Sequence, residues 1–155
     1  TGVGTARYAP AACSYGENRG IFAFGNAGGQ QNMSNLVSSA GVIGTDVTGV
    51  GIARSYLAAC EYGYDKGIFG YGNTTTDTAI TNLVSNTGVV ATDTSGVGTT
   101  RQLLMACEYG GDKGIFGYVG SSTSITSLVS NVGVVSSDVT GVGTARTNPG
   151  ACSFN

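Results

Sequence analysis

The feature that most constrains the fold of this chain is an internal repeat. The phrase Thr48-Gly-Val-Gly-Ile-Ala-Arg54 occurs, with small changes, four times along the sequence. The arginines that close it are Arg7, Arg54, Arg101 and Arg146, spaced 47, 47 and 45 residues apart. A repeat of this length indicates stacked copies of one small structural unit. The chain therefore divides into units at about 7–53, 54–100 and 101–145, with a partial fourth unit over 146–155.

Each unit is expected to form about four short strands, and the second unit shows the pattern most clearly. Alternating side chains predict a first strand over 54–62, with Arg54 and Tyr56 on the same side, and a second over 68–71. Gly63 in the intervening turn can take a positive φ. A third strand is expected over 80–84 and a fourth over 89–92. Glycine and β-branched residues interrupt every candidate helix, so the sequence predicts an all-β protein.

Length and composition restrict the class of protein further. At 155 residues and 15.5 kDa the chain is predicted to be a single repeat domain. Its net charge is -2 with only seven basic residues, which argues against nucleic acid as a partner. No apolar run approaches the roughly 20 residues of a membrane span, so no membrane partner is expected. The opening Thr1-Gly-Val-Gly has neither Met nor a leader pattern, as expected of a processed chain or a fragment of a longer one.

The order of elements within a unit resembles that of the kelch family of β-propeller blades. There too an arginine opens the unit and a glycine pair closes the second strand. The pair corresponds here to Phe24-Gly25, Tyr71-Gly72 and Tyr118-Val119-Gly120, and the late tryptophan of that family is absent. The phrase Leu83-Val-Ser-Asn-Thr-Gly-Val-Val90 is also similar to tandem-repeat phage proteins of structural or tail-fibre type. That second resemblance implies a virion-associated or extracellular location.

Three blades are too few for a closed propeller, which needs about four to eight. We therefore expect a homodimer in which two chains complete a six-bladed ring, with residues 140–155 lending a strand across a seam. The alternative is a threefold monomer, a β-trefoil or β-prism, which three units of this size could complete unaided.

Charged residues recur at equivalent positions, which favours a structural role. Each arginine is expected to pair with the preceding aspartate, eight residues earlier, or with loop carbonyls, and so to hold one unit to the next. The alternative is a ring of equivalent ligand sites. The residues assigned to this inter-repeat role are Arg7, Arg54, Arg101, Arg146, Asp46, Asp93 and Asp138.

No pattern in the sequence points to catalysis or to a cofactor. The chain lacks histidine, and its carboxylates do not form a close pair in sequence, so we expect no enzyme activity and no catalytic residues. One cysteine occurs per unit, without the close spacing of zinc ligands, so no metal site is expected. These cysteines are predicted to be buried, reduced and apolar in their packing: Cys13, Cys60, Cys107 and Cys152.

Two classes of function remain. The first is a non-enzymatic scaffold, such as a component of a virion appendage. The second is a module that binds a glycan or a peptide through its end loops, where tyrosines beside acidic residues are typical of sugar platforms. The candidates for such a site are Tyr15, Tyr62, Tyr109, Asp65 and Asp112, although for the tyrosines we favour a structural role, in which they cap the turns and pack on the next unit.

Overall fold

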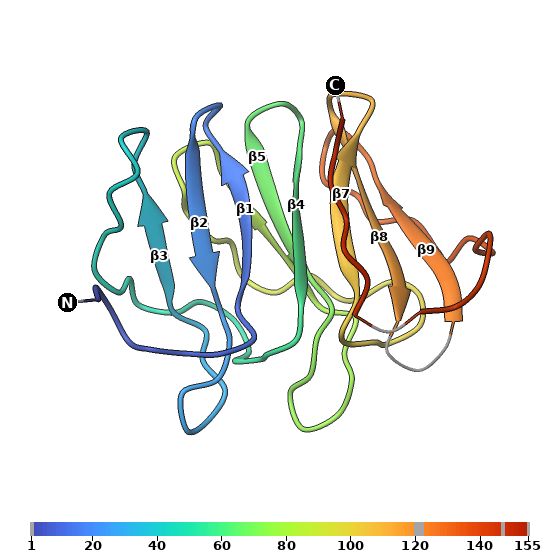
Figure 1. The fold of residues 1–155 in the computed structure, drawn as a ribbon, viewed down its shortest axis with the longest axis horizontal. Helices are drawn as coiled ribbons and strands as arrows, with labels where there is room; N and C mark the ends of the chain where they lie inside the picture. Colours follow the sequence, from blue (N-terminus) through green and yellow to red (C-terminus); the bar gives the residue numbers. More distant parts are fainter. Residues whose placement is uncertain (1, 120–122, 147, 155) are drawn as a thin grey trace.

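The computed structural model describes residues 2–119, 123–146 and 148–154, and Figure 1 shows their arrangement. The fold is all-β, as predicted, and the described residues contain no helix. Gly120, expected to close the second strand of the third unit, lies outside the described residues.

Each repeat unit forms one three-stranded antiparallel sheet in which consecutive strands pair. The registers are equivalent, since Cys13 pairs with Ile21, Cys60 with Ile68 and Cys107 with Ile115. Gly63 has a φ of 60°, as its place in the turn requires. The strands are β1 (Ala11–Tyr15), β2 (Arg19–Ala23) and β3 (Ser34–Val37); β4 (Ala58–Tyr62), β5 (Lys66–Gly70) and β6 (Thr81–Val84); and β7 (Met105–Tyr109), β8 (Lys113–Val119) and β9 (Thr123–Val129).

The three sheets lie side by side, and none closes into a barrel (Figure 1). The first strands are neighbours: β1 packs against β4 and β5 of the next sheet, and β4 packs against β7 and β8. The third strands β3 and β9 lie at opposite sides of the view. Each sheet therefore presents the same two faces to its neighbours in the chain.

The hydrophobic core lies between the sheets, because a three-stranded sheet of this size has nothing of its own to cover its faces. One buried cluster joins the first two sheets and a second joins the last two. Their members include Tyr15, Ile21, Phe24, Leu57, Phe69 and Val84 in the first, and Tyr62, Ile68, Tyr71, Leu104, Phe116 and Val129 in the second.

The expected fourth strand is not formed. The segment after β6 pairs with it through two isolated bridges, Val84 to Val90 and Thr81 to Thr94, rather than as a strand. The pairing shifts by one residue between the two bridges, so no continuous ladder forms. The third unit, which has Ser127 in place of Asn82, forms the equivalent pair of isolated bridges. In the second unit Asn82 Nδ2 also donates to the backbone oxygen of Ala91 at 3.0 Å.

The expected first strand begins four residues late. Tyr56 has a φ of 56°, and β4 starts only at Ala58. The same backbone conformation recurs at equivalent positions, with φ values of 51° at Ala9, 57° at Leu103 and 48° at Asn148. Arg54 and Tyr56 therefore do not share the face of a strand: Arg54 is buried and Tyr56 is exposed.

Candidate functional site

The arginine that opens each unit packs on an aromatic ring of the unit before it. The guanidinium carbon of Arg54 lies 4.1 Å from the centre of the Phe24 ring, and that of Arg101 lies 4.0 Å from the centre of the Tyr71 ring. Both arginines are fully buried. A guanidinium can stack on a ring face while its edge still donates hydrogen bonds, which a lysine ammonium cannot do. These two contacts hold neighbouring units together.

The edge of each guanidinium is bound within its own unit. Arg54 donates from Nε to the backbone oxygen of Tyr71 at 2.9 Å and from Nη2 to Oδ1 of Asn82 at 2.7 Å. Burial lowers the pKa of Arg54 to about 10, partly offset by the charge of Asp93. Arg54 therefore remains protonated at neutral pH, and its charge is satisfied mainly by neutral oxygen atoms.

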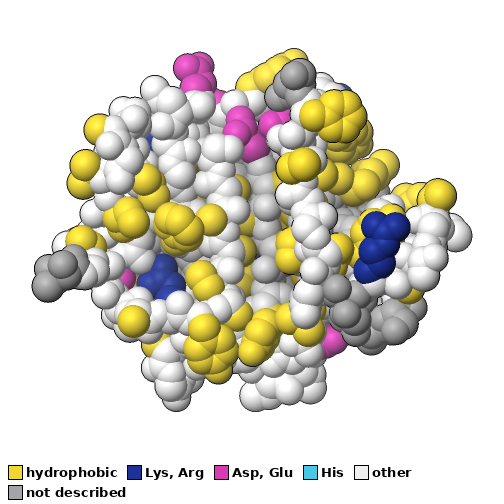
Figure 2. Space-filling view, in the orientation of Figure 1, with side chains coloured by type: hydrophobic (Ala, Val, Ile, Leu, Met, Phe, Trp, Pro, Cys, Tyr) yellow, Lys and Arg dark blue, Asp and Glu magenta, His cyan; other side chains and the backbone are white. Residues whose placement is uncertain are grey.

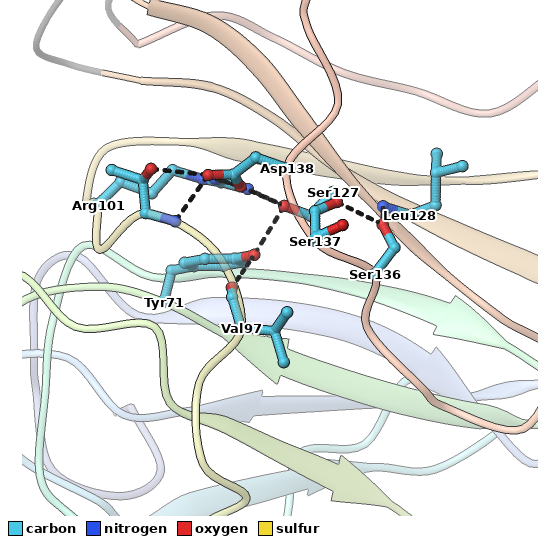
Figure 3. Close-up of polar contacts among 9 residues, drawn as sticks. Tyr71, Val97, Arg101, Ser127, Leu128, Ser136, Ser137 and Asp138 are labelled. Carbon is cyan, nitrogen blue, oxygen red and sulfur yellow. Dashed lines mark hydrogen bonds and ion pairs between the residues drawn. The ribbon is translucent and has the colours of Figure 1, made fainter.

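The third unit has an ion pair at the equivalent position (Figure 3). Arg101 Nη1 lies 2.9 Å from Asp138 Oδ1, and Nη2 donates to Ser127 Oγ at 2.7 Å. The hydroxyl of Tyr71, from the preceding unit, donates to the same Ser127 oxygen at 2.9 Å. One buried hydroxyl thus connects the second unit to the third.

The aspartate that pairs with an arginine is the one that follows it, within the same unit, rather than the one eight residues before it. Arg101 pairs with Asp138, and Arg7 Nη1 lies 3.7 Å from Asp46 Oδ1. Asp93 accepts the backbone N–H of Ile52 at 2.9 Å and Nδ2 of Asn82 at 2.8 Å. The aspartates therefore close each unit by joining its end to the loop that opens it.

Hydrogen bonds at Asp138 outweigh the effect of its desolvation. Burial raises the pKa of this carboxyl, but the hydroxyl and backbone N–H of Thr99, with Arg101 and Ser127, lower the pKa to about 2. Both bonds from Thr99 measure 2.7 Å. The carboxylate is therefore ionised at any pH at which the protein is studied under ordinary conditions.

Two other parts of this arrangement were not predicted from the sequence. The first is the set of aromatic rings under the arginines: Phe24, Tyr71 and Tyr118. The second is the polar side chain that bridges arginine and aspartate: Asn35, Asn82 and Ser127. The aromatic and the polar position both recur at the spacing of the arginines, and this recurrence could have identified them as partners.

The partial fourth unit begins in the same way. Arg146 lies 5.1 Å from the centre of the Tyr118 ring, which repeats the stacking of Arg54 and Arg101 less closely. Asn148 has the positive φ of its equivalents in the other units. At Arg146 and over 148–154, the part of this segment that the structure describes, no strand is formed, and Phe154 is exposed.

Two of the three candidate binding tyrosines are buried between units. Tyr15 and Tyr62 are each 3% exposed, whereas Tyr109 is 38% exposed. A Cβ atom placed on Gly88 would lie 2.9 Å from the Tyr15 ring, and one on Gly133 would lie 3.0 Å from the Tyr62 ring. Each buried tyrosine therefore packs on a glycine of the next unit, and only Tyr109 is open to a ligand.

The candidate aspartates also hold turns in place. Asp65 binds Lys66 Nζ at 2.6 Å and Asn86 Nδ2 at 3.0 Å, and Asp112 is bound in the same way by Lys113 and Asn131. The hydrogen bonds from the lysine and from the asparagine lower the pKa of both carboxyls. Figure 2 shows acidic side chains gathered at the end of the molecule that carries the β1–β2 and β4–β5 turns.

All four cysteines are free, but they are not equally buried. Cys60 is buried, Cys13 and Cys107 are half-buried, and Cys152 is exposed, which corrects the expectation that all four are buried. Burial raises the pKa of Cys13 to about 12 and that of Cys60 still further, so both remain protonated thiols. They pack as small apolar groups.

Among the described residues, no group of three or more His, Cys, Asp or Glu side chains lies close enough to hold a metal ion together. That part of the chain also contains no helix long and apolar enough to cross a membrane. Neither the scan against protein-family models nor the search of curated proteins gave a match.

Proposed function

We propose that this chain is a non-enzymatic repeat scaffold whose three units are kelch-like propeller blades. The observation that carries the proposal is the use of its charged and aromatic residues. The guanidinium groups of Arg54 and Arg101 are buried between units and bound to ring faces, amide oxygens or Asp138. Those groups hold the units together, and their hydrogen bonds and ring contacts are made within the scaffold.

Two chains of three blades make the six-bladed ring that we propose as the working form. Stacked units with first strands side by side agree with blades whose first strands face a common axis. The likeness of the repeated phrase to phage structural proteins makes a virion appendage the setting we propose for such a ring.

Electron microscopy of the full chain in negative stain tests this proposal. We expect rings with six radial lobes. Particles with three lobes arranged around one axis would contradict the ring and favour a threefold monomer.

A second function, the binding of a glycan or a peptide, is favoured by one observation only. Tyr109 is exposed beside the turn that contains Asp112. A glycan array should then give signals that Tyr109→Ala removes and that Tyr15→Ala does not remove selectively. We prefer the scaffold, because Tyr109 also occupies the position at which Tyr15 and Tyr62 meet a following unit.

A further inference from the structure

The aromatic contact between neighbouring units is incomplete at both ends of the chain. The Phe69 ring packs edge-on to the Phe24 ring with their centres 5.4 Å apart, and Phe116 packs in the same way on Tyr71 at 5.2 Å. The equivalent of Phe69 in the first unit is Phe22, which is 41% exposed although Phe69 and Phe116 are fully buried. The equivalent of Phe24 in the third unit is Tyr118, and in the described residues no phenylalanine packs on it. One end therefore has the ring that inserts, and the other has the ring that receives it.

A contact between a thiol and a glycine also has one unpaired partner at each end of the chain. A Cβ atom on Gly67 would lie 2.5 Å from Cys13 Sγ, and one on Gly114 would lie 2.5 Å from Cys60 Sγ. At the equivalent Gly20 a Cβ atom would meet only its own unit, at 3.5 Å from Val37. The first unit thus exposes the glycine of this pair, and the third unit carries the unmatched thiol, Cys107.

The tyrosine contact shows the same pattern. Gly88 and Gly133 lie under the rings of Tyr15 and Tyr62, whereas a Cβ atom on the equivalent Gly41 would meet nothing within 4 Å. Tyr109, the tyrosine without a following unit, is exposed. The open glycine is on the first unit and the open ring is on the third.

A backbone hydrogen bond is also left half-made at each end. Gly16 N–H donates to the backbone oxygen of Asp65 at 2.7 Å, and Gly63 N–H donates to that of Asp112 at 2.8 Å. Gly110 is the equivalent donor in the third unit, and Asn18 holds the equivalent acceptor in the first. Within the described part of the chain, neither of these two groups makes a bond of this kind.

A cavity lies where an incoming ring would sit. It has a volume of about 190 Å³ and is lined on one side by Met105, Cys107, Gly117 and Tyr118, and on the other by Arg146 and Pro149. Between the second and third units, the ring of Phe116 occupies the matching place over Gly70. A Cβ atom on Gly70 would lie 2.7 Å from that ring. A cavity of about 150 Å³ is enough to hold benzene, so this one can accept a phenyl ring.

From these four divided contacts we infer that the chain binds a second copy of itself head to tail, the first sheet of one copy packing on the third sheet of the other. With the C-terminal segment displaced from its side of the cavity, Phe22 packs beside Tyr118, Gly20 lies against Cys107, and Gly41 receives Tyr109. This inference rests on the proposed scaffold function, but it specifies the surfaces and does not require that a ring close. A heterologous contact of this kind gives a ring only if the rotation between copies closes.

The C-terminal segment competes for the same surface. Arg146 lies on Tyr118, where Arg7 of a second copy would lie by analogy with Arg54 on Phe24. Figure 1 shows this segment running along β7 and β8. The segment and the first strand of another copy cannot both occupy that place, so the segment acts as a cap that association displaces.

The contact is tested by sedimentation velocity on the full chain over a range of concentrations, comparing the wild type with Gly20→Ala. In the free chain the added methyl group meets only Val37 and the backbone oxygen of Cys13, at ordinary contact distances. In the complex it would lie against Cys107. We expect the dissociation constant to rise at least tenfold, and Phe22→Ala to weaken association comparably. The matched control is Gly29→Ala, at a loop glycine where a Cβ atom meets nothing within 4 Å.

A second substitution makes this test specific. Cys107→Ala removes the thiol that Gly20→Ala would meet, so the double variant should recover most of the lost affinity. If Gly20→Ala leaves the dissociation constant unchanged, the inference is overturned, and a ring would have to form through some other surface. Masses that grow beyond two copies would support the inference and contradict the six-bladed ring.

The role of the C-terminal segment is tested by Arg146→Ala. Because this exposed arginine stabilises the cap, its loss should strengthen association about tenfold, the equivalent of about 1.4 kcal/mol. Weaker association would show instead that the segment is lent to the partner and would overturn the competition. If wild type and Arg146→Ala both stay monomeric at every concentration, the head-to-tail contact itself is wrong.

Discussion

At the scale of single residues, the structure depends on guanidinium groups buried between a ring and an amide. Arg54 stacks on Phe24 with one face and binds Tyr71 and Asn82 with its edge. A buried charge is stabilising only when its donors are all satisfied in good geometry, and removing its partners leaves a large desolvation cost. The planar fork of Arg54 meets that requirement. At the equivalent positions, the buried Nε atoms of Arg7 and Arg101 make no hydrogen bond.

Arg54→Ala should lower the free energy of unfolding by about 3 kcal/mol, because it leaves the amide of Asn82 and the face of Phe24 without their partner. Urea denaturation monitored by tyrosine fluorescence measures the change. Arg19→Ala is the control, since Arg19 is exposed, and it should change stability by less than about 0.5 kcal/mol. Equal effects of the two substitutions would exclude a special role for the buried arginine.

Asp138 makes the free energy of unfolding depend on pH in the acidic range. Its pKa in the folded protein is about 2, below the value of about 3.9 expected when unfolded. Its contribution is therefore complete above about pH 4 and is lost as the pH falls through about 2. The advantage of the wild type over Asp138→Asn should shrink by about 2 kcal/mol between pH 6 and pH 2. A gap that stays constant over that range would contradict the assignment.

At the scale of strands and sheets, the repeat made much of the fold predictable and hid some of its details. The all-β class and the turn at Gly63 followed from glycine content and alternation. The fourth strand was wrongly predicted, because the segment after β6 shifts its pairing by one residue between its two bridges and forms no continuous ladder. Strand propensity alone carries no information on such a shift in register.

The candidate site shows the same limit. Equivalent positions of a repeat were expected to behave alike, yet Tyr15 is buried and Tyr109 is exposed. Exposure depends on whether another unit follows, which is a property of stacking and not of local sequence. The arginines were predicted because they recur. The positions of Phe24 and Asn82 recur as well, but their assignment as partners of Arg54 required knowledge of which faces meet.

The sheet-to-sheet contacts allow a matched comparison of equivalent residues. Phe69→Ala should cost about 3 kcal/mol, because a fully buried ring leaves a cavity between the first two sheets. Phe22→Ala should cost less than about 1 kcal/mol in dilute solution, since that ring is partly exposed in the single chain. Thermal melts of both variants measure the difference, and similar losses would mean that the first sheet is already covered.

At the scale of the whole molecule, the chain is a short stack whose two ends are unlike but complementary. Repeat proteins are stabilised by contacts between neighbouring units, and terminal units need a cap or a partner. Here the first unit exposes Phe22 and Gly41, while the third is only partly covered by the segment that begins at Arg146. A second copy would complete both ends at once.

The most direct test of this account is the molar mass of the full chain in solution, measured by light scattering as it elutes from a sizing column. We predict a species with twice the 15.5 kDa of one chain, giving way to the single chain on dilution. A mass of one chain at every concentration, for the wild type and for Arg146→Ala alike, would contradict it.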